Sequence, residues 1–169
     1  MSRALIRALD PVKDYAITAG LFARATDYAM LESGLPPDAA TLADFFTGDH
    51  PDIDHTKSLR LGLFQGPTLA IIAEMAFGYP NPGDAFIGLL LAAPEYRNLG
   101  LGHELLDHLA AEARARLCPR LLIAVLDANA GGKRFWLRQG FVVIFTTEPI
   151  PRGLKTHVFH RMARPLPPL

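Results

Sequence analysis

The residues from Tyr96 to Glu104 have the composition of a phosphate-binding turn. They follow an apolar run at residues 85–93 and lead into a helical pattern that continues to Leu117. Glycine at positions 100 and 102 lets a bulky ligand approach the backbone, because glycine has no Cβ atom. The unpaired N–H groups of a first helical turn, together with the positive end of the helix dipole, attract phosphate. The same glycines also fit a turn that only reverses the chain, and spacing alone does not separate these interpretations.

Two other phosphate-binding motifs fit this sequence less well. The chain has no Gly-x-x-x-x-Gly-Lys-Ser/Thr sequence, which excludes the loop that binds nucleoside triphosphates. A dinucleotide fingerprint requires a third glycine where Leu105 stands, and it normally follows the first strand of a domain.

A second motif downstream supports a cofactor-binding role for the turn. The turn itself, Arg97-x-x-Gly-x-Gly, resembles the pyrophosphate-binding signature Arg/Gln-x-x-Gly-x-Gly/Ala of the GCN5-related N-acetyltransferase (GNAT) family. Further along, Asn129 is followed by Trp136 and then by Gly-Phe, which is similar to the family's segment Asn-x-x-Ala-x-x-x-Tyr-x-x-x-Gly-Phe. Two motifs in the family's order are more specific than either alone, and the resemblance covers about residues 86–144.

The resemblance implies an α/β fold of the GNAT type. Its central sheet would be mixed and mostly antiparallel, with about six to seven strands and helices on both faces. Acetyl-CoA would lie in a cleft between the strand at residues 85–93 and the strand at residues 121–127. Backbone groups of Leu90, Leu91 and Ala92 would bind the pantetheine arm and the acetyl carbonyl. Ala92 is also a catalytic candidate, because a fixed N–H stabilises a developing oxyanion without reorganising.

The other cofactor candidates form two groups. The pyrophosphate would bind at the turn, where the candidates are Arg97, Asn98, Leu99, Gly100, Leu101, Gly102 and His103. The second motif supplies Asn129, Gly132, Phe135 and Trp136. Asn129 also fits the N-cap of the following helix. The two aromatic residues fit the hydrophobic core as well as they fit a cofactor channel.

One departure from the family pattern affects the proton chemistry. The family's tyrosine, which often protonates the departing thiolate, is replaced by Trp136. An indole N–H donates a hydrogen bond but is not a proton source near neutral pH. Tyr79, Tyr96 or water would then supply the proton, or the thiolate would leave unassisted, which a thiol pKa of about 8.5 permits.

Glu74 is the first candidate for the general base that an amine acceptor requires. It is an isolated acid in the apolar strand at residues 69–77, and apolar surroundings raise the pKa of a carboxyl group. Glu74 also fits an outward-facing residue or one half of an ion pair. Glu32 and Asp84 are alternative bases.

These residues predict an acetyl-CoA-dependent N-acetyltransferase. The acetyl group would pass to a primary amine of a small molecule or an amino acid by direct attack in a ternary complex. The alternative is a catalytically weak module that binds or senses acyl-CoA, which the replacement of tyrosine by Trp136 favours. A third interpretation is an interaction protein that keeps only the fold.

Composition limits the class of protein. The 169 residues suit one domain, at residues 1–164, followed by a proline-rich tail at residues 165–169 that we expect to be frayed. A net charge of zero argues against non-specific nucleic-acid binding. The only cysteine, Cys118, excludes an internal disulfide and fits a half-buried thiol. Without a secretory signal or a membrane-spanning stretch, we expect a cytoplasmic protein with no membrane partner, and a homodimer is compatible with the sequence.

No metal site is expected. The loop at residues 49–55 is rich in Asp and His but lacks the spacing of a helical or hairpin site. His157 and His160 would face opposite sides of one strand.

Residue periodicity and turn signals predict alternating strands and helices. We expect strands at residues 5–9, 59–64, 69–77, 85–93, 121–126, 141–147 and 157–163. We expect helices at residues 10–24, 26–33, 36–48, 102–117 and 130–139, the fourth burying Leu117. Because the strand at residues 85–93 is apolar throughout, we expect it to be covered on both faces.

Overall fold

The computed structural model of the chain describes residues 3–48 and 50–169, so Asp49 and the first two residues lie outside the description. A seven-stranded sheet has the order β1-β2-β3-β4-β5-β9-β6. Its strands are β1 (Leu5–Ala8), β2 (Leu59–Gln65), β3 (Thr68–Phe77), β4 (Ala85–Ala92), β5 (Arg120–Leu126), β6 (Val142–Thr146) and β9 (Phe159–Pro165). Paired neighbours are antiparallel except β4 and β5, which are parallel. The expected α/β fold with a mostly antiparallel central sheet is confirmed.

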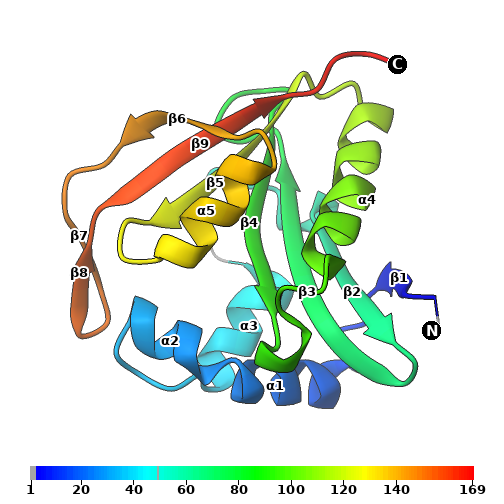
Figure 1. Cartoon of the computed structure of the whole chain (residues 1–169), viewed down its shortest axis with the longest axis vertical. Coiled ribbons are helices and arrows are strands. Elements are labelled where there is room, and N and C mark those ends of the chain that lie inside the picture. The colour runs from blue at the N-terminus through cyan, green and yellow to red at the C-terminus, as the bar shows by residue number, and fades with distance from the viewer. Residues whose placement is uncertain (1–2, 49) are drawn as a thin grey trace.

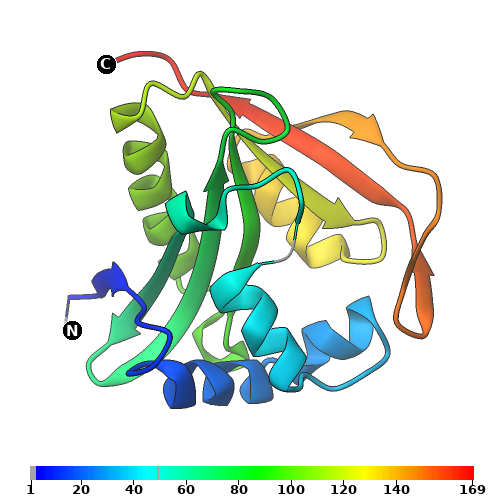
Figure 2. The same cartoon turned by 180° about the vertical axis from the view of Figure 1, so that it is seen from behind.

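Helices lie on both sides of this sheet (Figures 1 and 2). They are α1 (Tyr15–Arg24), α2 (Thr26–Glu32), α3 (Ala39–Thr47), α4 (Leu101–Ala115) and α5 (Ala130–Arg138), with short 3-10 helices at His55–Lys57 and Pro94–Tyr96. Helices α4 and α5 pack on one face of the sheet, and α1 and α3 pack on the other, where α2 continues from α1.

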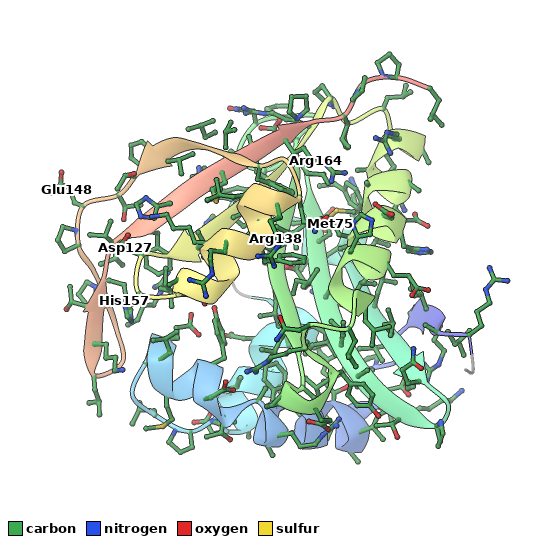
Figure 3. All side chains as sticks on the ribbon, viewed as in Figure 1. Met75, Asp127, Arg138, Glu148, His157 and Arg164 are labelled. Carbon is green, nitrogen blue, oxygen red and sulfur yellow. The ribbon has the colours of Figure 1, made fainter. Side chains whose placement is uncertain are left out.

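The sheet separates two hydrophobic cores. Helix α4 buries leucine and alanine at helical spacing, namely Leu105, Leu106, Leu109, Ala110 and Ala113. Met75 of β3 belongs to the same cluster, between the sheet and α4 (Figure 3). Phe22 and Phe45 pack on the opposite face against Ile72. Strand β3, which places Ile71 in one core and Ile72 in the other, is therefore the strand that is covered on both faces.

Strand β4 separates from its parallel neighbour part-way along its length. It pairs with β5 only at Ala85–Ile87, and with β3 as far as Ala92. A bulge interrupts the β3–β4 register at Gly88, because Glu74 pairs with Leu89 and the next residue of β3 pairs with Ile87. The expectation that this strand is covered on both faces was wrong, since Gly88 is exposed and Leu89 and Leu90 are half-buried. Ala85, Ile87 and Leu91 are buried in the cores, whereas the half-buried residues of β4 border open cavities.

Two helix ends differ from the prediction. Asp10 accepts hydrogen bonds from the N–H groups of Val12 and Lys13 at 2.8 Å, which forms a turn, and α1 begins only at Tyr15. The C-terminal end of α4 is at Ala115, before the predicted end at Leu117. Leu117 has a φ of 60° and is 89% exposed, so it ends the helix and is not buried with it. The third helix begins as predicted, with Asp38 and Thr41 forming a reciprocal cap.

The C-terminal region contains a hairpin that the sequence did not predict. Strands β7 (Ile150–Arg152) and β8 (Lys155–His157) form a separate two-stranded sheet beside α2 (Figure 1). The Leu154 N–H donates to the Ser33 carbonyl at 2.8 Å, and His157 Nε2 lies 2.7 Å from the Glu32 carbonyl oxygen. The hairpin therefore forms a wall against the C-terminal end of α2.

The end of the chain is more ordered than a frayed tail. Strand β9 extends to Pro165, and Leu166 is buried with its N–H bonded to the Pro119 carbonyl at 2.8 Å. Cys118 is also fully buried rather than half-buried.

Candidate functional site

A cleft of about 510 Å³ occupies the space where β4 separates from β5. Beyond Ile87, the edge of β4 that faces β5 has no strand partner among the described residues, so the backbone N–H groups of Leu90 and Ala92 on this edge are available to a ligand. The other walls are the turn before α4, the N-terminal half of α5 and one side of α2. The cleft therefore offers mainly backbone groups along an apolar strand.

The turn before α4 presents an uncapped helix N-terminus. Asn98 and Gly100 have φ values of 60° and 80°, in the left-handed region that asparagine and glycine tolerate. Gly100 is the N-cap and has no side chain that could cap the helix, so the first N–H groups of α4 have no intrahelical partner. A Cβ atom on Gly102 would lie 3.3 Å from the Phe135 ring. Glycine at this position therefore keeps the cleft open between the turn and α5.

Arg97 connects the turn to two other elements. Its Nε donates to the Ala92 carbonyl at 3.1 Å, and its Nη2 donates to an Asp27 carboxylate oxygen at 2.9 Å. The hydrogen bonds from this guanidinium hold the pKa of Asp27 below its usual range. The side chain thus fixes the turn to β4 and α2, and a direct contact with a phosphate stays a prediction.

Asn129 and Gly132 fit each other closely at the start of α5. Asn129 Oδ1 accepts a hydrogen bond from the Gly132 N–H at 2.9 Å, so the N-cap interpretation is correct and both residues also line the cleft. A Cβ on Gly132 would lie 2.5 Å from the Asn129 amide nitrogen, which explains glycine where the family usually has alanine. Trp136 is 8% exposed and packs edge-on against Phe135 and Phe141, so it belongs to the core and borders the cleft with one edge.

The structure brings most of the cofactor candidates together around this cleft. Only Leu99 and Leu101 lie outside its lining, and Leu99 is mostly exposed. Sequence reasoning missed other lining residues, which include Asp27, Tyr28, Leu31, Arg134 and Gln139. Arg134 follows Asn129 within the second motif. Its positive charge could have been predicted from the sequence to lie near the phosphate-binding turn.

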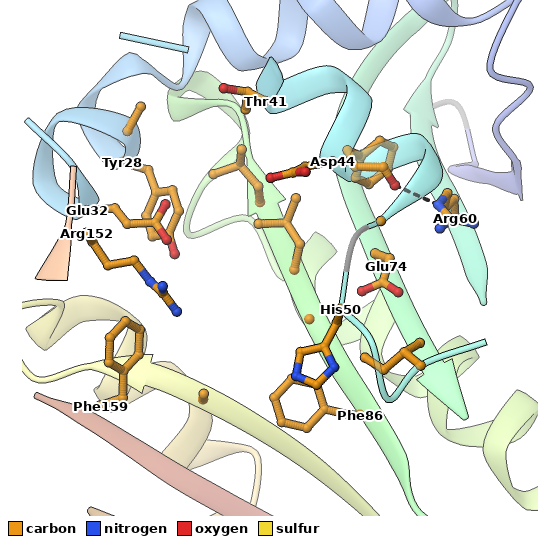
Figure 4. Close-up of a pocket in the computed structure, with 18 of the residues that line it drawn as sticks. Tyr28, Glu32, Thr41, Asp44, His50, Arg60, Glu74, Phe86, Arg152 and Phe159 are labelled. Atoms are coloured by element: carbon orange, nitrogen blue, oxygen red, sulfur yellow. Dashed lines mark hydrogen bonds between the residues drawn. The ribbon is translucent and has the colours of Figure 1, made fainter. Parts of the chain in front are cut away.

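A second pocket, of about 580 Å³, lies on the other side of β4. Its walls come from α2, α3, the loop after α3, β2, β3 and the C-terminal hairpin (Figure 4). Tyr28 and Leu91 line both the second pocket and the cleft. The two cavities therefore meet at these two residues.

Glu74 lies in the second pocket. Its Oε2 occupies the space of the missing side chain at Gly88, where a Cβ would approach it to 2.3 Å. Its Oε1 is buried and has no hydrogen-bond partner among the described residues. Burial raises the pKa of Glu74, and the charge of Arg60 opposes this shift only in part. No ion pair within 4.0 Å joins Glu74 to any residue that the structure describes.

The two alternative bases differ in their surroundings. Glu32 also lines the second pocket, and burial raises its pKa. Asp84 is buried outside both cavities, where it accepts hydrogen bonds from Arg120 at 2.8 and 2.9 Å. These bonds lower the pKa of Asp84, which makes it half of a structural ion pair.

The tyrosines also separate by position. Tyr96 lines the cleft and Tyr79 lines the second pocket, whereas Tyr28 lines both. Burial, followed by the negative charge of Glu32, raises the pKa of Tyr28 and keeps its phenol protonated.

Within the described part of the chain, the structure contains neither a metal centre nor a membrane span. Among residues 3–48 and 50–169, no three His, Cys, Asp or Glu side chains are grouped so that they could hold a metal ion. His157 and His160 lie on different strands, and His160 contacts Asp127 at 2.7 Å. Over the same two ranges, no helix combines the length and the apolarity that crossing a bilayer requires.

A sequence model of the Acetyltransferase (GNAT) family matches residues 40–141. The chain belongs to this family. It is therefore an acetyltransferase, and the cleft beside β4 corresponds to the place where the resemblance puts acetyl-CoA. A search of curated proteins finds no match.

Solved structures agree with this fold. An acetyltransferase from Thermus thermophilus has a TM-score of 0.74 at 24% identity, covering 98% of each chain. The Escherichia coli ribosomal-protein-S18-alanine N-acetyltransferase has a TM-score of 0.73 at 21% identity, covering 97% of this chain and 94% of that one. The Thermoplasma acidophilum PaiA N-acetyltransferase, solved with coenzyme A, has a TM-score of 0.68 at 18% identity, covering 97% and 99%. At these identities the similarity shows the fold alone.

Proposed function

We propose that this acetyltransferase moves an acetyl group from acetyl-CoA to a primary amine of a small acceptor, by direct attack in a ternary complex. The observation that carries this proposal is the meeting of the two cavities at Tyr28 and Leu91. A thioester in the cleft and an amine in the second pocket would meet there. Holding both reactants in one place supplies much of the rate enhancement by orientation.

The cleft fits a pyrophosphate-bearing donor with an extended arm. The free N–H groups at the start of α4 would bind the pyrophosphate, because a helix N-terminus attracts phosphate. The unpaired edge of β4 at Leu90–Ala92 would bind the amides of pantetheine and the acetyl carbonyl. The Ala92 N–H stays our candidate for oxyanion stabilisation.

Glu74 would take the proton from the attacking amine, directly or through water. The amine nitrogen forms a bond to the acetyl carbon, the carbon–sulfur bond breaks, and the electron pair leaves on sulfur as the coenzyme A thiolate. A raised pKa makes the Glu74 carboxylate a stronger base near neutral pH. Its unpartnered Oε1 is free to accept that proton.

Tyr28 would return a proton to the thiolate. It replaces Tyr79 and Tyr96 as our first candidate, because it alone among these tyrosines lines both cavities. Its phenol stays protonated at neutral pH and can donate a hydrogen bond to the departing sulfur, although the raised pKa makes it a weaker acid than an exposed tyrosine. The absence of the family's tyrosine at Trp136 then argues less for a weak binding module, because a phenol lies at the junction.

The test is turnover of acetyl-CoA with a panel of primary amines, followed by release of the free thiol and by mass spectrometry of the product. We expect an N-acetylated amine and one thiol per product. Acetyl-CoA binding without any amine acetylation would favour the sensing module. A cytoplasmic location, a single domain at residues 1–164 and a homodimer stay predictions.

A further inference from the structure

Resting on the proposed function, we infer that the acceptor is an amine that also carries a carboxylate, as an amino acid does. The carboxylate would bind Arg152 and Arg161, which both line the second pocket. The amine would lie on the side of Glu74, across from Arg152 (Figure 4). The pocket thus offers both cations and a carboxylate to one zwitterionic molecule.

Arg152 and Arg161 have no carboxylate partner in residues 3–48 and 50–169. No described carboxylate lies within 4.0 Å of either guanidinium, whereas Arg97 and Arg120 each bind an aspartate. Both line the second pocket, although they come from different strands, β7 and β9. An anion in the pocket would give these charges the partner that the fold does not supply.

Aromatic neighbours hold the two guanidinium groups in place. Arg152 lies 5.2 Å from the centre of the Phe159 ring. Arg161 lies 5.6 Å from the ring of Phe86 and 5.7 Å from that of Tyr79, and its Nη2 donates a long hydrogen bond of 3.4 Å to the Tyr79 hydroxyl. A guanidinium is planar, and a ring beside it restricts its orientation, which suits two parallel hydrogen bonds to a carboxylate.

Carboxylates lie on both sides of the pocket, with Glu32 beside Arg152 and Glu74 on the far side. Figure 4 shows Glu74 across the pocket from Arg152, whose guanidinium points into the space between them. Glu74 lines the pocket and has no ion pair within 4.0 Å among the described residues, so this end of the pocket can receive the ammonium group or its conjugate amine. Glu32 is close enough to Arg152 for their charges to interact, yet no ion pair within 4.0 Å is formed between these two described residues.

The experiment compares three acceptors that differ only at the carboxylate: L-phenylalanine, L-phenylalaninamide and 2-phenylethylamine. A second set uses L-leucine, L-leucinamide and 3-methylbutylamine. We expect kcat/KM for the amino acid to exceed that of its two analogues by roughly tenfold or more, the usual effect of a charge-assisted hydrogen bond. The amide has the less basic amine and thus the larger unprotonated fraction, so amine protonation cannot produce a preference for the amino acid over the amide.

Variants test whether the two arginines cause the preference for the amino acid. Arg152→Gln and Arg161→Gln should each reduce it to about threefold or less, mainly through KM for the amino acid. Arg152→Lys should retain part of it, because lysine keeps the charge without the paired N–H groups. Arg138→Gln is the matched control, since Arg138 is exposed on α5 and lines neither cavity. Circular dichroism verifies that each variant is folded.

The outcomes separate the inference from the proposed function. Equal kcat/KM for the amino acid, amide and amine would overturn the inference and leave the amine acetyltransferase intact. A preference for the amide, which mimics a peptide N-terminus, would also overturn it and indicate a peptide acceptor. If no amine is acetylated, the proposed function fails. The inference is then tested by calorimetry with N-acetyl-L-phenylalanine and N-acetyl-2-phenylethylamine in the presence of coenzyme A, and equal affinity would overturn it.

Discussion

The cleft beside β4, which we propose as the donor site, and the second pocket, which we propose as the acceptor pocket, are built from different chemical groups. The cleft is formed mostly by two stretches close in sequence, residues 90–103 and 129–139, and its main functional groups are backbone N–H and C=O. The acceptor pocket collects charged side chains from α2, β2, β3, β7 and β9, which lie far apart along the chain. The cleft therefore consists mainly of backbone groups from nearby stretches of sequence, and the second pocket consists of side chains from distant stretches.

This difference explains how one fold can keep its donor while its acceptor changes. A backbone N–H does not depend on the residue that carries it, so the cleft requires only that certain positions remain small. Each charge in the acceptor pocket depends on a single side chain, and one substitution changes what the pocket recognises. Substitutions in the two sites should consequently affect different measured quantities.

The largest expected effect is the loss of acetyl-CoA binding in Gly102→Glu. The added side chain would meet Phe135, and its carboxylate would repel the pyrophosphate at the start of α4. We expect calorimetry to show an affinity reduced on the order of a hundredfold. Gly20→Glu is the control, because a Cβ at Gly20 on α1 meets nothing within 4 Å. Unchanged affinity in a folded Gly102→Glu protein would contradict the cofactor assignment.

The next effect should be confined to turnover. Glu74→Gln removes the base, so kcat should fall on the order of a hundredfold while the affinity for acetyl-CoA stays the same. Glu148→Gln, at an exposed position, is the control. Full activity of Glu74→Gln would assign the base to Glu32 or to bulk water.

The pH profile tests Glu74 independently. Its pKa is raised by burial, so the carboxylate is protonated and inactive as a base over a pH range that extends above the usual range of glutamate. The wild-type rate should therefore fall, as pH decreases, at a higher pH than an exposed glutamate would give, and Glu74→Gln should lack this acid limb. An identical limb in both proteins would show that another group titrates.

Tyr28→Phe, at the junction of the two cavities, should have a smaller effect on kcat, because the thiolate leaves readily. We expect kcat to fall roughly tenfold, less than is typical of a general acid, since a thiol of pKa about 8.5 is a good leaving group. Tyr15→Phe, on an exposed tyrosine of α1, is the control. A larger loss in Tyr79→Phe or Tyr96→Phe would move the acid to that residue.

The smallest effect on catalysis is expected for Trp136→Phe. Trp136 is packed in the core, so the substitution should reduce the free energy of unfolding by roughly 1–2 kcal/mol and leave kcat nearly unchanged. Urea unfolding measures the first quantity, and Val142→Ala at an exposed position of β6 should change it little. A large loss of kcat with intact acetyl-CoA binding would show that the indole acts on the thioester.

The contrast between the sites also explains what the sequence could predict. The cleft follows from short motifs, since Gly100, Gly102 and Asn129 act within a few residues of their own positions. The splitting of β4 from β5 could not be predicted from periodicity, because an apolar strand beside a cleft has the same composition as one in a core. The hairpin at β7 and β8 was missed because its short strands contain proline, arginine and lysine.

The acceptor side shows the same limitation. Glu74 was identifiable because a lone acid interrupts an apolar strand. The positions of Arg152 and Arg161 depend on a hairpin and a strand that reach the pocket only through tertiary packing. The spacing of residues along the chain does not predict such packing. Tyr28 was missed for the same reason, since α2 precedes the matched motifs by many residues.

Helix α2 has a thermodynamic consequence for both sites. None of its side chains is fully buried, and polar contacts hold its two ends: Asp27 binds Arg97, and the Ser33 carbonyl accepts from Leu154. Helix α4 buries five residues, so its local opening costs far more free energy. Amide hydrogens of α2 should consequently exchange with deuterium well before those of α4. Because Tyr28 lines both cavities, each such opening event would expose the donor and the acceptor to solvent together.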